Sequence, residues 1–253
     1  MNTHNRWSIF QLAAPPRFYD LTQRWAIPLW TLAVLFGVAG LWVGFVVAPT
    51  DATQGEAYRI LFIHVPAAWM SMVLYLAMAA WALVGWAWKS RMASLLARAI
   101  APSGALWTAI ALWTGAIWGQ PTWGTWWAWD ARMTSELILL FLYLGYMALQ
   151  QGIEDPLKSD MAGAVLAGVG AINVPVIYMS VKWWNTLHQG ATISMTAAPK
   201  MAQTMLLALT LCTLACWAYT FATVFARARR LALDRDQDHA WTRAHALPTT
   251  KAT

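Results

Sequence analysis

Two histidines that are bordered by tryptophans are the first residues in this sequence that could do chemistry. His64 lies in the stretch ILFIHVPAAWM, and His188 lies in KWWNTLHQG. Neutral imidazole is the commonest metal ligand among side chains, so the pair could bind a metal ion. The other three histidines, His4, His239 and His245, lie near the N-terminus or in a basic C-terminal segment, where a solvated imidazole needs no special role.

A tryptophan-rich segment, WGTWWAWDARMTSEL, runs from Trp123 to Leu137 and is the second such feature. Read as a short helix, it places three indoles and one carboxylate on one face, at the spacing i, i+3, i+4, i+7. These residues are Trp123, Trp126, Trp127 and Asp130. An aromatic belt is the alternative, because tryptophan gathers at membrane interfaces. The concentration of indoles on one segment favours a specific ligand that is flat and apolar.

The composition indicates whether the surroundings of these residues are water or a membrane. Hydrophobic residues make up 59% of the chain and charged residues 11%, whereas about a quarter of the residues of a soluble domain are charged. Six charge-free runs reach or approach the ~20 residues that cross a bilayer. They lie between Arg24 and Asp51, between Arg59 and Lys89, between Arg98 and Asp130, and over Leu137–Ile153, Met161–Val181 and Met201–Ala226. The sequence therefore predicts an all-α integral membrane protein, a bundle of six transmembrane helices with the tryptophan-rich loop between the third and fourth.

The distribution of lysine and arginine predicts the orientation, because cations near helix ends stay on the cytoplasmic side. With six spans both termini share one side, and that side holds most of the cations: Arg6, Arg17, Arg24, Lys89, Arg91, Arg98, Lys158, Arg227, Arg229, Arg230, Arg235, Arg243 and Lys251. The other side holds Arg59, Arg132, Lys182 and Lys200. We therefore expect cytoplasmic termini and an outer tryptophan-rich loop. The same rule explains the basic balance, so no nucleic-acid partner is inferred.

One membrane domain is expected over residues 25–226, between a cytoplasmic segment at 1–24 and a basic cytoplasmic tail at 227–253. The tryptophan-rich loop covers about residues 119–136, and Trp183 to Pro199 reads as another loop. No cleavable leader pattern precedes the first span, so we expect it to stay in the mature chain. Cys212 and Cys216 lie four apart on one helix face, which favours small apolar filling.

The topology puts His64 and His188 on the same outer face. Pro66 suits a first helical turn and pushes Val65 toward an extended conformation, so we expect His64 at the outer mouth of the second span. An ionisable group at membrane depth is a functional candidate, because it is costly there unless it is paired. Two facing imidazoles can be axial ligands of a haem iron, whereas zinc usually takes three or four protein ligands.

A porphyrin would also use the other residues of that face. Indoles can stack on its plane, and its two propionates can pair with Arg59, Arg132 or Lys182, of which arginine binds carboxylates best. In the fifth span, Asn173 and Pro175 follow a run of small residues, and we expect the helical hydrogen-bond ladder to be interrupted there.

Three segments of the sequence resemble a known family. WGTWWAWDARMTSELILLFLYLGY resembles the WWD signature of the haem-handling proteins of cytochrome c maturation, and AINVPVIYMSVKWWNTLHQ with IHVPAAWMS is similar to the haem exporter protein C (CcmC) branch. The resemblance runs from about Trp25 to Phe225. It implies that His64 and His188 ligate the haem iron and that the WWD loop helps to hold the haem. The candidate cofactor-binding residues are then His64, His188, Trp123, Gly124, Trp126, Trp127, Trp129, Asp130, Arg132 and Trp184.

The resemblance also implies partners and a location. A protein of this kind binds a b-type haem transiently at the periplasmic face of the bacterial inner membrane. It presents the haem to the periplasmic haem chaperone CcmE, which is loaded covalently through its own histidine. It works beside the ABC transporter subunits CcmA and CcmB and the small subunit CcmD. No conventional enzyme activity is expected, and a contribution to covalent loading stays open.

Two other functions make different demands on the sequence. A permease or channel that itself translocates haem needs a polar path through the bundle, but the six runs contain almost no ionisable groups. An electron-transferring b-type cytochrome should carry paired histidines deep within its helices, often in two pairs, whereas this sequence offers one outer pair. Haem presentation therefore fits the sequence best.

Overall fold

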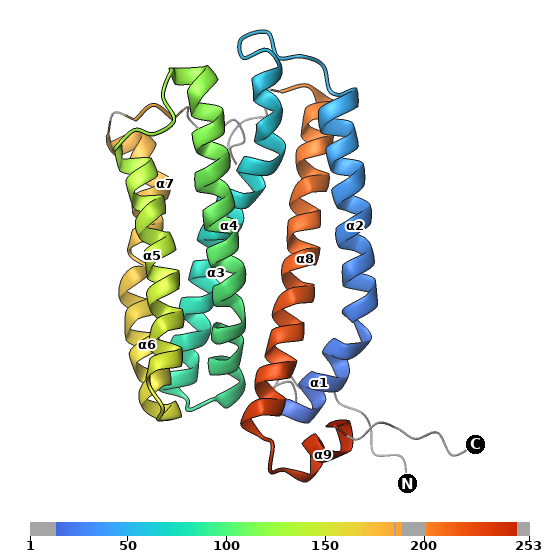
Figure 1. Cartoon of the computed structure of the whole chain (residues 1–253), viewed down its shortest axis with the longest axis vertical. Coiled ribbons are helices and arrows are strands. Elements are labelled where there is room, and N and C mark those ends of the chain that lie inside the picture. Colours follow the sequence, from blue (N-terminus) through green and yellow to red (C-terminus); the bar gives the residue numbers. More distant parts are fainter. Residues whose placement is uncertain (1–13, 185, 189–200, 247–253) are drawn as a thin grey trace, which may run out of the picture.

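The computed structural model describes residues 14–184, 186–188 and 201–246, and its regular elements in these ranges are helices (Figure 1). They are α1 (Pro15–Arg24), α2 (Ala26–Trp42), α3 (Leu61–Ala87), α4 (Arg91–Trp123), α5 (Ala131–Gly152), α6 (Pro156–Gly170), α7 (Asn173–Trp183), α8 (Gln203–Arg235) and α9 (Ala240–Ala246). A π-helical turn, Val43–Val47, continues α2, and a 3-10 turn, Glu56–Ile60, leads into α3. Most of the loop predicted over Trp183 to Pro199 lies outside the described residues.

Six helical stretches are long and apolar enough to cross a membrane. They are Ala26–Val47, Glu56–Ala87, Arg91–Trp123, Ala131–Gly152, Pro156–Trp183 and Gln203–Arg235. The predicted fold, an all-α membrane protein with six spans, is confirmed. The helices run beyond the charge-free stretches, because arginine, alanine and leucine are good helix formers. Thus α8 continues past Ala226 to Arg235, and α5 begins at Ala131 within the tryptophan-rich segment.

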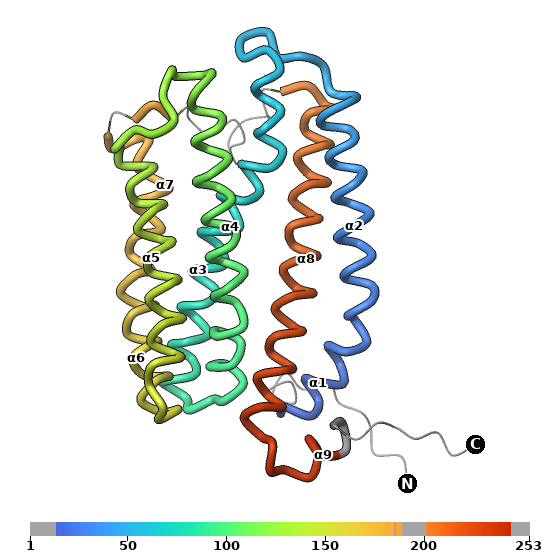
Figure 2. Tube along the Cα trace, viewed as in Figure 1, coloured from blue at the N-terminus to red at the C-terminus, as the bar shows by residue number. Residues whose placement is uncertain are grey.

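The helices form two packed groups. In Figures 1 and 2, α2 lies along α8, and α3 to α7 form the other group, which meets α8 through α3 and α4. The loop from α4 to α5 and the segment after α7 lie at one end, which we call the histidine end because His188 is there. The short helices α1 and α9 lie at the opposite end (Figure 1).

The interior of the larger group is built around two tyrosine rings. Tyr75 and Tyr143 are fully buried and meet edge to face, with ring centroids 4.9 Å apart. The hydroxyl of Tyr143 donates to the carbonyl oxygen of Ser71 at 2.8 Å. Gly104 of α4 lies directly against Tyr143, and a Cβ atom there would be 2.1 Å from the ring carbon Cζ. Glycine is therefore required at 104 for α4 and α5 to approach this closely.

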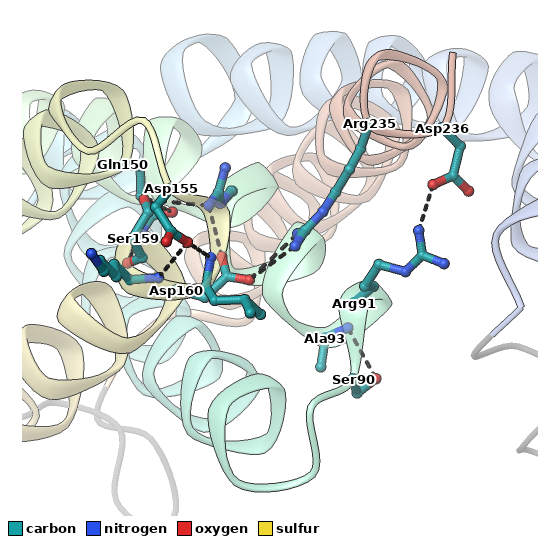
Figure 3. A network of polar contacts seen from close by, with 12 residues as sticks. Ser90, Arg91, Ala93, Gln150, Asp155, Ser159, Asp160, Arg235 and Asp236 are labelled. Carbon is teal, nitrogen blue, oxygen red and sulfur yellow. Dashed lines mark hydrogen bonds and ion pairs between the residues drawn. The ribbon is translucent and has the colours of Figure 1, made fainter. Parts of the chain in front are cut away.

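An ionic cluster joins three helices at the opposite end (Figure 3). Asp160 of α6 accepts from Arg98 of α4 at 2.7 Å and from Arg235 of α8 at 3.4 Å. Arg91 of α4 pairs with Asp236 just beyond α8, again at 2.7 Å. These side chains explain why the basic residues at the end of α8 are part of the packed bundle.

The fifth span is interrupted, as the sequence predicts. Helix α6 ends at Gly170 and α7 begins at Asn173. Pro175 lies in the first turn of α7, where a missing N–H does not cost an intrahelical hydrogen bond. The side chain of Asn173 donates from Nδ2 to the carbonyl oxygen of Ser135 at 2.8 Å, which attaches the start of α7 to α5.

The contact at Gly104 leads to a stability prediction. Gly104→Ala should lower the free energy of unfolding by about 1–3 kcal/mol, because the new methyl group overlaps the buried Tyr143 ring. Gly37→Ala in α2 is the matched control, since its Cβ would be 3.7 Å from its nearest neighbour, Ala215. That control should be neutral or stabilising, because alanine is a better helix former. Thermal unfolding in detergent measures both, and a Gly104→Ala protein as stable as the wild type would contradict the packing described.

Candidate haem site

The structure brings the rings of His64 and His188 close together at the histidine end. Their ring centroids are 6.4 Å apart and their planes are tilted by 35°. Two imidazoles that bind one metal ion from opposite sides, each ~2.0 Å from the metal, have centroids roughly 6 Å apart. The spacing therefore suits opposed ligands of a single metal ion.

The position of His64 differs from the expectation that Pro66 starts the helix. Val65 is helical and Pro66 lies inside α3, which begins at Leu61 after a 3-10 turn. The physical reason is packing upstream of the proline. Phe62 is fully buried, and its ring lies 5.8 Å from that of Tyr58, so this turn stays helical despite the cost of Pro66. His64 consequently lies in the first turn of α3, and Pro66 follows in the second turn.

Helix α4 determines which nitrogen of His64 can act as a ligand. The Nδ1 atom of His64 lies 3.1 Å from Thr114 Oγ1. Thr114 donates its own proton to the carbonyl oxygen of Ile110 at 2.6 Å, so its oxygen accepts from His64. Nδ1 then carries the proton and Nε2 carries the free lone pair, as a metal ligand requires.

The same helix shapes the space around that imidazole. Trp118 meets the His64 ring edge to face, with centroids 5.6 Å apart. A Cβ atom on Gly115 would be 3.0 Å from His64 Cε1, so a larger residue there would press on the ring.

His188 is held among aromatic and charged groups just beyond α7. Its ring centroid lies 5.0 Å from that of Trp123, at an interplanar angle of 48°. Burial, and to a lesser extent the charge of Arg132, lower the pKa of His188 to about 4, although Asp130 acts in the opposite direction. The imidazole is therefore neutral at physiological pH, the form that binds metals. Its Nδ1 atom is buried and has no hydrogen-bond partner among the described residues.

A small cavity of about 20 Å³ lies between the two imidazoles. It is lined by His64, Ala68, Ala111, Leu112, Gly115, Arg132, Met133, Glu136 and His188. This volume suits one water molecule, so the cavity is far too small for a porphyrin. The donor set fits an iron with two axial imidazoles, while room for the macrocycle requires the surrounding side chains to separate.

The tryptophan-rich segment is not helical between the two helices, so the expected single face of indoles is wrong. Trp123 is the last residue of α4, Gly124 has the left-handed φ of 76°, and Asp130 caps α5. Glycine adopts this conformation readily and ends helices for that reason. The Nε1 atom of Trp127 is buried without a hydrogen-bond partner among the described residues.

The indoles accordingly divide into two sets. Trp123 and Trp127 are partly buried, and Trp123 touches His188. Trp126 and Trp129 point outward, with 60% and 77% of their surface exposed. Trp184 is also half exposed and lies edge to face with Trp183. Trp123 therefore borders His188, whereas the exposed indoles offer an aromatic surface at the same end of the bundle.

Of the three cations considered for propionate pairing, two are already bound to the protein. Arg59 donates to the carbonyl oxygens of Gly44 and Ala48, at 2.6 and 3.1 Å, and pairs with Glu56. Arg132 donates to the carbonyl oxygen of Ile177 at 3.0 Å and lines the cavity.

Lys182, the third cation, lies on the last turn of α7 and is exposed. Its ammonium group is the most accessible of the three for an anionic ligand.

Two groups at the site escaped the sequence reasoning. Thr114 lies in an uncharged span, and nothing local indicates that it faces His64. Glu136 is buried beside the cavity, and it accepts from the hydroxyl of Ser71 at 2.6 Å. The signal for Glu136 was present, because an acid within a membrane helix is a functional candidate in its own right.

Comparisons with known proteins agree with the fold and the motifs. A family model described as "Heme exporter protein C" matches residues 8–243. The "Heme exporter protein C" of Escherichia coli (strain K12) is 50% identical over 187 residues, which cover 73% of this chain and 76% of the relative. That of Haemophilus influenzae is 44% identical over 211 residues, which cover 83% of this chain and 85% of the relative.

A third relative, from Marchantia polymorpha, is described as a ccmC-like mitochondrial protein of cytochrome c biosynthesis. It is 45% identical over 165 residues, which cover 65% of this chain and 68% of the relative. The family match extends over nearly the whole chain and includes both histidines and the tryptophan-rich segment. The chain therefore belongs to the heme exporter protein C family.

Proposed function

We propose that this chain binds haem between His64 and His188 and presents it to the periplasmic haem chaperone CcmE. Membership of the family implies a role in haem handling for cytochrome c maturation. The observation that carries the finer proposal is the pair of imidazoles, whose centroids lie 6.4 Å apart across a small cavity. This spacing supports two axial ligands on one iron.

The side chains around the pair have distinct tasks in this proposal. Thr114 keeps the proton of His64 on Nδ1, so that Nε2 is available to the iron. Burial keeps His188 neutral. When haem is bound, His64 and His188 would supply their lone pairs to its iron. Trp126 and Trp129 are exposed on the loop that follows Trp123, where they can contact the porphyrin edge or an approaching protein.

The wider proposal includes the delivery of haem and the orientation of the protein. We place the histidine end at the periplasmic face of a bacterial inner membrane, because most cations lie toward the opposite end. An ABC transporter of CcmA and CcmB, with the small subunit CcmD, completes the assembly. A permease role has less support, because Arg59 and Arg132 are held by backbone carbonyls and do not line a continuous path.

The ligand assignment predicts a spectroscopic change. Purified wild-type protein should bind haem with the spectrum of bis-imidazole iron, and His64→Ala and His188→Ala should each lose that spectrum. The control is His239→Ala, since His239 lies beyond α8, at the opposite end. Absorbance spectra of the oxidised and reduced proteins provide the measurement. A bis-imidazole spectrum that survives in either single variant would exclude that histidine as a ligand.

The Thr114 contact predicts a smaller effect on affinity. Thr114→Val removes the acceptor of the His64 proton, and haem should bind ~10–100-fold more weakly, as is typical when the partner of a ligating histidine is lost. Thr114→Ser keeps the hydroxyl group and should restore binding. Haem titration followed by absorbance distinguishes the variants, and equal affinity for valine and serine would refute this role for Thr114.

The orientation can be tested by labelling cysteines from outside intact cells. In a background with Cys212 and Cys216 replaced by serine, Trp129→Cys should react with a membrane-impermeant maleimide. Trp88→Cys should react only after the cells are permeabilised. Trp88 and Trp129 are matched in exposure, 75% and 77%, but lie at opposite ends of the bundle. Labelling of Trp88→Cys in intact cells would reverse the proposed orientation.

A further inference from the structure

Asp130, the acid that follows the tryptophans, uses both carboxylate oxygens on the protein backbone. Its Oδ1 atom accepts from the N–H of Met133 at 2.8 Å, which caps the start of α5. Its Oδ2 atom accepts from the N–H of Leu187 at 3.2 Å. Leu187 immediately precedes His188. One carboxylate therefore links the beginning of α5 to the backbone that carries an imidazole of the site.

The segment around His188 has little other polar support among the described residues. The hydroxyl oxygen of Thr186 and the Nδ1 atom of His188 are both buried without a hydrogen-bond partner there. Trp123 touches the His188 ring, but a contact between rings does not fix the backbone. The bond from Leu187 to Asp130 acts one residue away from the imidazole.

Among the described residues, this bond is the last of three between the start of α5 and the chain that runs through α7 to His188. Asn173 donates to the carbonyl oxygen of Ser135, and Arg132 donates to that of Ile177. Leu187 then donates to Asp130, beyond the end of α7. We call these three hydrogen bonds the α5–α7 seam. Because of the seam, α7 and the segment after it are held along the first part of α5.

We propose that Asp130 is a positioning residue that holds His188 opposite His64 by binding the Leu187 amide. It acts through the backbone and not by touching haem. A carboxylate can only accept hydrogen bonds, and haem propionates are acceptors as well. Asp130 therefore has no hydrogen-bond donor with which to bind a propionate. This inference rests on the proposed function only in treating His188 as a haem ligand.

The roles of the two Asp130 oxygens can be tested separately. Asparagine caps helices as well as aspartate does, so Asp130→Asn keeps the cap of α5. Its single acceptor oxygen then serves Met133, and its NH₂ group faces the N–H of Leu187 without accepting from it. Asp130→Ser also keeps a capping oxygen and has no second acceptor, so it replaces the asparagine variant if that variant does not accumulate.

Asp155 provides a matched control. It caps α6 by accepting from the N–H groups of Leu157 and Lys158, at 2.9 and 3.2 Å, both in its own helix. Asp155→Asn therefore makes the same chemical change at a helix start, but it does not touch the segment that carries His188.

Two measurements on the full-length protein test the proposal. In haem-free protein, hydrogen exchange of the Leu187 amide should become roughly tenfold faster in Asp130→Asn and stay unchanged in Asp155→Asn. In haem-loaded protein, Asp130→Asn should shift the spectrum toward that of His188→Ala. Added free imidazole should restore the bis-imidazole spectrum, since it can take the place of a displaced ligand.

The outcomes separate this inference from the proposed function. Unchanged exchange at Leu187 would overturn the backbone role of Asp130, whatever the haem spectrum shows. Faster exchange with an intact bis-imidazole spectrum would also overturn it, because His188 would then hold its place without Asp130. A haem spectrum that is the same in wild type and His188→Ala would instead refute the ligand role of His188, and the exchange result would still decide whether Asp130 holds the Leu187 backbone.

Discussion

The histidine end is organised by one constraint, which is that a polar group at membrane depth must find its partner within the protein. Arg59 binds the carbonyl oxygens at the end of α2, Arg132 binds that of Ile177, and Glu136 accepts from Ser71. Each of these side chains stabilises a junction between helices. In the sequence these charged side chains seem available to a ligand. In the structure they mainly bind other parts of the protein.

Some buried polar atoms at the histidine end nevertheless lack a hydrogen-bond partner among the described residues. The Nδ1 atom of His188 and the Nε1 atom of Trp127 are buried without partners in the described part of the chain. An unsatisfied buried donor or acceptor costs free energy, and it is usually kept for a reason. Both atoms lie on residues of the proposed site, and the cavity beside His188 is bordered by Arg132 and Glu136. These two unsatisfied atoms and the proposed ligand pair thus lie at the same end of the bundle, whereas the partnerless atoms of Tyr75, Arg98 and Arg229 lie elsewhere.

The sequence was sufficient for the spans but not for the details of the site. Charge-free runs identify membrane helices because charges are costly in hydrocarbon, and the break at Asn173 follows from local rules. The same local rules misplaced two features. Phe62 packs tightly enough to carry the helix through Pro66, and Gly124 ends α4 before the indoles can share a face. Periodicity alone does not show such competition between packing and local preference.

Contacts between residues that are far apart in the sequence are harder still to predict from it. The pairing of His64 with Thr114 joins residues fifty positions apart, and that of Ser71 with Glu136 joins residues sixty-five apart. Topology could place both histidines on one side of the membrane, but it could not bring their rings to a defined spacing. That spacing depends on how α3, α4 and α7 pack, and packing is a property of the whole bundle.

The small cavity lined by the two imidazoles affects the free energy of ligand binding. The two imidazoles proposed as ligands already stand at the separation that an iron needs, so little conformational entropy is lost in ordering them. The cost of binding falls instead on side chains that must move apart to admit a broad, flat molecule. Such a site combines preorganised coordination with a cavity that must widen before a porphyrin can enter. Both properties suit the proposed delivery of haem to another protein.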